Sequence, residues 1–125
     1  MKIARCIILA AAIVLFIGGL AHLLGYKVVL VPTLLKSNLE PRVVAAIRCV
    51  WLVFTAEAVI LSPALVWISR KPGTRTLLLY LSLLPIVEFI LMYHFVGLFL
   101  GSYMMAVAAM LLVLGAWLLP QDKQV

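Results

Sequence analysis

Two glutamates, Glu57 and Glu88, lie near the centres of two consecutive apolar segments. Glu57 is about 20 Å of helix from Arg42 and from Arg70, and Glu88 is thirteen residues from Arg75 and from Gly101, at a rise of about 1.5 Å per residue. A carboxyl group is costly in hydrocarbon unless it is paired, protonated or in contact with a polar cavity. Two acids at matching depth can exchange a proton, bind a cation or hydrogen-bond a polar ligand head. We therefore predict that Glu57 and Glu88 are catalytic or ligand-binding, the alternative being hydrogen bonds that only pack neighbouring helices.

His22 is the third candidate for this intramembrane site. Small residues recur every seven positions along the first apolar segment, at Ala4, Ala11, Gly18 and Gly25. His22 follows Gly18 by four residues, so it belongs to the same helix face, which is expected to contact the other helices. A buried imidazole needs a polar partner, and Glu57 or Glu88 can provide one. The alternative is a hydrated histidine, because His22 is only about one turn from the end of its segment.

Arg48 and His94 are candidates for ligand-binding residues at the outer mouth of the site. Arg48 precedes Glu57 by nine residues, a rotation of about 180°, so a straight helix points the two side chains in opposite directions. Arg48 can also extend its guanidinium to lipid headgroups. His94 follows Glu88 by six residues, a rotation of about 120°. The five residues are therefore not expected to form a single cluster.

Several other chemistries lack their minimum parts. The two histidines are on separate segments and no HxxxH or HxxE pair is present, so the sequence predicts no metal site. No glycine-rich phosphate loop is present, and no serine has a histidine at helical spacing to activate it. We expect no cofactor.

These residues are expected to lie on transmembrane helices. Of the 125 residues, 67% are hydrophobic and only 11% are charged, a balance that a soluble domain of this size does not have. The apolar segments approach the ~20 residues that a helix needs to cross a bilayer. The sequence predicts an all-α integral membrane four-helix bundle, a single domain over residues 1–125, with spans at 3–24, 43–69, 76–96 and 102–119.

The basic residues indicate how the bundle is oriented. One side carries six of them: Lys2, Arg5, Arg70, Lys71, Arg75 and Lys123. The other side carries three, all in the first loop: Lys27, Lys36 and Arg42. Because cytoplasmic loops carry the excess of Lys and Arg, both termini are predicted to be cytoplasmic (N-in/C-in). We expect a multi-pass protein of the plasma (inner) membrane.

The first loop, Gly25–Arg42, is predicted to be a long outer connection between the first and second helices. It is too apolar for a solvated linker, and Pro32 and Pro41 bracket a stretch, Thr33–Glu40, that can form a short interfacial helix. This segment either caps the bundle as a lid or packs on the membrane interface.

Three functions remain open on the sequence alone. The first is binding or acid–base processing of a lipophilic small molecule at Glu57, Glu88 and His22. The second is a non-catalytic accessory or assembly subunit with a membrane-protein partner, and the third is a proton-coupled transporter that works as a homo-oligomer. The lipid bilayer is the expected surroundings in each case. Nucleic-acid binding is not expected, because the basic residues form topology signals rather than a patch.

Overall fold

The computed structural model describes residues 1–120, and every regular element in that part of the chain is a helix. Four helical segments there are long and apolar enough to cross a membrane: Lys2–Leu35, Pro41–Ile68, Arg75–Phe95 and Leu100–Trp117. They are built from α1 (Lys2–Gly25), η1 (Tyr26–Leu30), α2 (Val31–Leu35), α3 (Pro41–Ile68), α4 (Arg75–Leu81), α5 (Leu83–Phe95) and α6 (Leu100–Trp117). The predicted all-α class with four membrane-length helices is confirmed.

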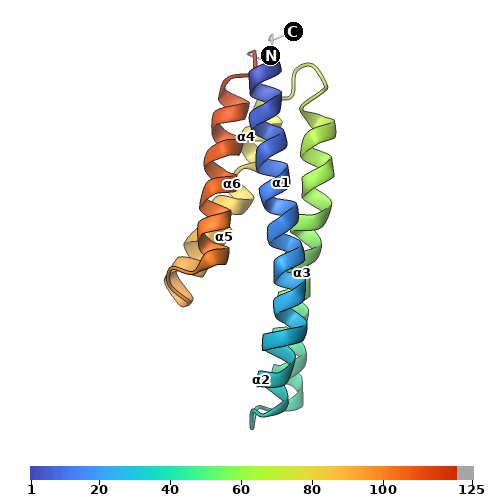
Figure 1. The fold of residues 1–125 in the computed structure, drawn as a ribbon, viewed down its shortest axis with the longest axis vertical. Coiled ribbons are helices and arrows are strands. Elements are labelled where there is room, and N and C mark those ends of the chain that lie inside the picture. The colour runs from blue at the N-terminus through green and yellow to red at the C-terminus, as the bar shows by residue number, and fades with distance from the viewer. Residues whose placement is uncertain (121–125) are drawn as a thin grey trace.

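Helix α1 lies between α3 and α6 and packs against both, while α4 and α5 pack against α6. Figure 1 shows the start of α1 and the end of α6 at the same end of the molecule, with α2 at the opposite end. The connection between α5 and α6 stops well short of α2, so the pair formed by α1 and α3 projects beyond the other helices (Figure 1).

Small side chains allow the closest helix contacts. Ala4 and Ala11 of the predicted small-residue face are almost fully buried, and Gly18 is also buried. On α6, a Cβ at Gly115 would come within 2.6 Å of Ile8 Cγ1 and 3.3 Å of the Ala4 carbonyl oxygen. The backbones of α1 and α6 therefore approach each other at glycine and alanine, which small side chains allow.

The first helical segment extends beyond the predicted end at Leu24, and the predicted long loop is shorter, because its short helix, α2, is continuous with α1 through η1. Helical backbone continues to Leu35, and the connection to α3 is only residues 36–40. Gly25 does not end the helix because its φ of −58° and ψ of −35° are ordinary right-handed helical angles. This segment extends α1 along α3 instead of folding over the bundle as a lid.

The extension passes Pro32 through a π-helical turn, Tyr26–Leu30. In this turn the backbone N–H of Val31 donates to the carbonyl of Tyr26, five residues back. Pro32 has no N–H to donate and its ring crowds the preceding turn. A locally wider turn, which π-helical segments provide within α-helices, accommodates the proline and lets the helix continue.

The third membrane-length segment is divided at Ser82, between α4 and α5. Pro85 leaves the Leu81 carbonyl without its usual helical donor, and the backbone departs from helix at this point. The Ser82 hydroxyl donates to the Leu79 carbonyl at 2.6 Å and is almost fully buried. The helix is therefore interrupted at Ser82, six residues before Glu88.

Candidate functional site

A cavity of about 430 Å³ lies between the α1–α3 pair and the ends of α5 and α6, and it contains both His22 and Glu88. We call it the His22–Glu88 cavity. Its floor on α1 is made of small residues, Gly18, Ala21 and Gly25, which leave the space unfilled. Phe99 and Leu100 also line it, so the cavity lies where α6 begins, beside the place where the two helix pairs diverge in Figure 1.

Glu88 is the most unusual residue of the cavity. Its side chain is only 9% exposed. Nevertheless, within residues 1–120 its carboxyl group has no hydrogen bond and no ion pair. Buried polar groups in folded proteins nearly always have a partner. A buried carboxyl group that faces a cavity and lacks one is therefore a candidate ligand-binding group.

His22 reaches the same cavity from α1 and is held there by two residues of α3. Its Nδ1 atom is 2.9 Å from Oγ1 of Thr55, and its ring stacks on Trp51 with the ring centroids 4.1 Å apart. The indole N–H of Trp51 donates in turn to the His22 carbonyl oxygen at 2.9 Å. These contacts fix both the ring plane and the position of His22 relative to α3.

The same contacts favour one of the two neutral tautomers of His22. The Thr55 hydroxyl is placed to donate its single hydrogen to the Trp51 carbonyl at 3.1 Å. With that hydrogen engaged, its oxygen accepts from His22, and the hydrogen of the neutral imidazole is on Nδ1. Nε2 then carries a lone pair, and in the described part of the chain it has no hydrogen-bond donor. The free lone pair can accept a hydrogen bond or a proton from a ligand.

Aromatic and methionine side chains make up much of the remaining lining. The aromatic residues are Trp51 and Phe54 from α3 and Phe99, and the methionines are Met92, Met104 and Met105. Sequence reasoning missed this group and also missed Thr55, the partner of His22. The only signal for Thr55 is a hydroxyl placed four residues after Trp51 in an apolar helix, a spacing that puts both on one face.

Glu57 does not line the His22–Glu88 cavity. It is half-buried on α3, close enough to Glu88 for the two carboxyl groups to interact electrostatically. The structure thus brings Glu57 near the predicted site but places it outside the space that His22 and Glu88 share.

Arg48 and His94, the predicted outer-mouth residues, are not in this cavity either. Arg48 lines a separate hollow formed by α2, the connection after it and the first turns of α3. Its Nε atom is buried there without a partner among residues 1–120. His94 is exposed near the end of α5 and contacts the edge of Phe95, with the ring centroids 4.8 Å apart.

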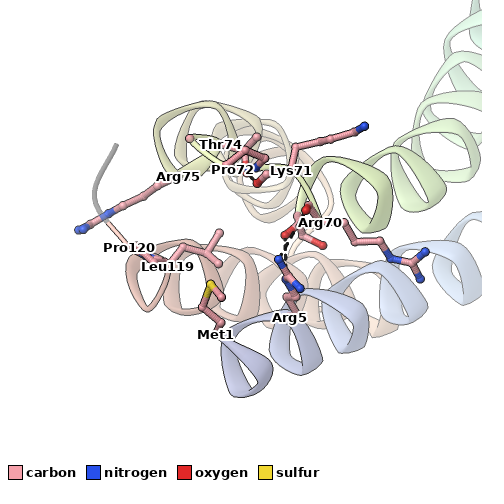
Figure 2. A pocket seen from close by; sticks show the side chains of 11 residues that line it. Met1, Arg5, Arg70, Lys71, Pro72, Thr74, Arg75, Leu119 and Pro120 are labelled. Atoms are coloured by element: carbon pink, nitrogen blue, oxygen red, sulfur yellow. Dashed lines mark hydrogen bonds between the residues drawn. The ribbon is translucent and has the colours of Figure 1, made fainter. Parts of the chain in front are cut away.

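A second hollow, of about 530 Å³, lies at the other end of the molecule, where α1 begins and α3 ends. Figure 2 shows Arg5 pointing across it, with its Nε atom donating to the Ser69 carbonyl at 3.2 Å. The side chains of Arg70, Lys71 and Arg75 point outwards in different directions. Arg5 thus caps the C-terminus of α3, while the other cations surround the hollow without converging in it.

Within residues 1–120, no three histidine, cysteine or acidic side chains form a group that could hold a metal ion. Comparisons of the chain with protein-family models, with curated proteins and with solved structures found no match.

Proposed function

We propose that this chain is a multi-pass protein of the plasma (inner) membrane that binds a lipophilic small molecule in the His22–Glu88 cavity. Both termini are cytoplasmic in this proposal. Arg5, Arg70, Lys71 and Arg75 all lie at the end of the molecule where α1 begins, which supports this orientation. Trp67 is exposed near that end, with the Lys71 ammonium 5.0 Å from its ring centroid, as expected at a membrane interface.

One observation carries the proposal: Glu88 is buried, has no partner within residues 1–120, and shares a cavity with the free Nε2 atom of His22. The carboxyl oxygens of Glu88 and Nε2 of His22 are not fully buried, so a ligand that enters the cavity can contact both with its polar head. The apolar and aromatic lining then accommodates the rest of the ligand, and the volume is in the range of small-molecule sites.

The same two groups also suit acid–base chemistry on a bound ligand. His22 Nε2 can take a proton, and the carboxyl group of Glu88 can give or receive one. Glu57 influences this pair through its charge, not by contact with the ligand. The primary proposal is binding, and processing of the ligand is a second step that uses the same residues.

The proposal is tested by extracting small molecules from the protein purified in lipid nanodiscs and identifying them by mass spectrometry. We expect one lipophilic compound to be enriched with the wild-type chain and reduced about tenfold in Glu88→Gln and His22→Phe, since a hydrogen bond to a charged group contributes about 1.5–3 kcal/mol. Glu40→Gln removes an exposed carboxylate outside the cavity and serves as the control.

Equal extracts from all four proteins would contradict the proposal. A larger membrane protein that copurifies in fixed ratio, with no enriched compound, would instead support the accessory-subunit alternative.

A further inference from the structure

The polar atoms of the His22–Glu88 cavity are suited to accept hydrogen bonds. Nε2 of His22 presents a lone pair, because Thr55 accepts the hydrogen on Nδ1. The Glu88 carboxylate offers only acceptor oxygens once it is ionised. Neither group has a donor among the described residues that would satisfy it. A ligand that complements these acceptors supplies positive charge or hydrogen-bond donors.

Among residues 1–120, no lysine or arginine lines the cavity. Arg48 of α3 lines a separate hollow instead, and its Nε atom is buried there. An anionic ligand head would therefore meet a carboxylate and a lone pair with no cation to balance it. A cationic head would meet complementary charge.

The aromatic lining favours the same kind of ligand. Phe54, Phe99 and Trp51 border the space in which Glu88 is buried. The faces of aromatic rings carry partial negative charge and attract ammonium groups, more strongly when the site excludes water. The Glu88 carboxylate, the His22 lone pair and the aromatic faces thus all favour a cationic head.

We infer that the ligand of the His22–Glu88 cavity is a lipophilic ammonium compound, with its cationic head beside Glu88 and His22 and its apolar part against the aromatic and methionine residues. This inference rests on the proposed function. The charged or titratable groups near Glu88 are His22 from α1 and Glu57 from α3, and α6 contributes none to the lining. Raising the pH deprotonates Glu88 and His22, and both changes favour a bound cation.

The test compares three probes that share one alkyl chain and differ only in the head: octyltrimethylammonium, 1-octanol and octanoate. The protein is placed in phosphatidylcholine nanodiscs, so that lipid charge does not concentrate the cation. Trp67→Phe and Trp117→Phe are introduced together, which leaves Trp51 in the cavity as the single fluorophore. Trp67 and Trp117 are both 63% exposed and lie outside the cavity lining.

We expect octyltrimethylammonium to change Trp51 emission saturably, with at least about tenfold tighter binding than octanoate. Glu88→Gln should remove this preference, whereas Glu40→Gln should keep it. Because the quaternary ammonium keeps its charge at every pH, its affinity should rise with pH in the wild type and change far less in Glu88→Gln.

Two results would overturn the inference while leaving the proposed function in place: octanol or octanoate binding as tightly as the ammonium, or an ammonium affinity that falls as the pH rises. If none of the three probes changes Trp51 emission, both the inference and the proposed function are wrong.

Discussion

The Nδ1 atom of His22 and the hydroxyl oxygen of Thr55 are 2.9 Å apart and join α1 to α3 at the edge of the cavity. This contact is one of three linked hydrogen bonds. The Thr55 hydroxyl donates to the Trp51 carbonyl, and the Trp51 indole N–H donates to the His22 carbonyl. The histidine is therefore positioned before any ligand arrives, with Nε2 as its open nitrogen.

Thr55→Val should remove the hydrogen bond that keeps the imidazole hydrogen of His22 on Nδ1. Valine has nearly the same shape but no oxygen, so Nδ1 loses its acceptor and the two neutral tautomers become mixed. We expect ¹⁵N NMR of the imidazole to show this mixture, in a His94→Gln background that leaves one histidine. The free energy of unfolding should fall by about 1–2 kcal/mol.

Ser62→Ala is the matched control for Thr55→Val. The Ser62 hydroxyl also donates to a carbonyl one turn earlier on α3, that of Ala58 at 2.6 Å, but does not contact His22. A wild-type tautomer pattern in Thr55→Val would contradict the assigned role of Thr55.

Gly25→Leu should fill the His22–Glu88 cavity without damaging the fold. A Cβ at Gly25 would meet only the Trp51 ring, at 3.5 Å, and the residue already has helical backbone angles. Replacing a helical glycine gains roughly 0.5–1 kcal/mol. We expect an equal or higher unfolding temperature together with loss of the Trp51 response to octyltrimethylammonium. Retention of that response would place the ligand elsewhere.

Gly115→Ala should destabilise the contact between α1 and α6. The new Cβ would be 2.6 Å from Ile8 Cγ1, with backbone atoms of Ala4 and Ile8 at 3.3 Å, so the helices must move apart. Overpacking of this kind costs about 1–3 kcal/mol. In Gly18→Ala the Cβ meets the end of the flexible Met104 side chain at 3.4 Å, and unfolding should be unchanged or improved. Equal thermal unfolding curves for the two variants would contradict this packing.

Arg5→Gln should weaken the attachment of α1 to the end of α3. The guanidinium donates to the Ser69 carbonyl at 3.2 Å and lies within 3.5 Å of the Arg70 carbonyl, both at the C-terminus of a 28-residue helix. A cation at this position contributes about 0.5–1 kcal/mol. Lys2→Gln, which removes an exposed cation of the same end, should have a smaller effect on the unfolding midpoint.

The proposed orientation is tested with single cysteines at Asn38 and Pro72. Cys6 and Cys49 are free and exposed, so both are first replaced by alanine. A membrane-impermeant maleimide should label Asn38→Cys on intact cells. Pro72→Cys should react only after permeabilisation, because the cationic end is cytoplasmic in the proposal. The opposite labelling pattern would reverse the topology.

Hydropathy and charge placement were sufficient to predict four membrane-length helices, because lipid requires every backbone polar group to be satisfied within a helix. They did not reveal the continuation of the first helix to Leu35. Gly25 and Pro32 are local breakers, but here packing of the extension along α3 and a π-helical turn allow the helix to continue. The positions of glycine and proline in the sequence carry no information about such packing between helices.

The candidate site was predictable only in part, for a similar reason. The depths of Glu57 and Glu88 can be counted along the sequence. The direction in which Glu57 points depends on which face of α3 packs against α1, and Trp51 and Thr55 occupy that face. Thr55 itself belongs to no recognisable motif, and its role becomes apparent only when His22 of the other helix is placed 2.9 Å away.

The unequal lengths of the helices have a consequence for access. Lys2–Leu35 has 34 residues, about 51 Å of helix, whereas Leu100–Trp117 has 18, about 27 Å. A bilayer with about 30 Å of hydrocarbon matches α6 and leaves the α1–α3 hairpin rising above it. The His22–Glu88 cavity lies at the step between these heights, where Val29 faces the start of α6. In the proposed orientation, an amphiphile diffusing laterally through the outer leaflet reaches the cavity from the side of the bundle, without passing through bulk water.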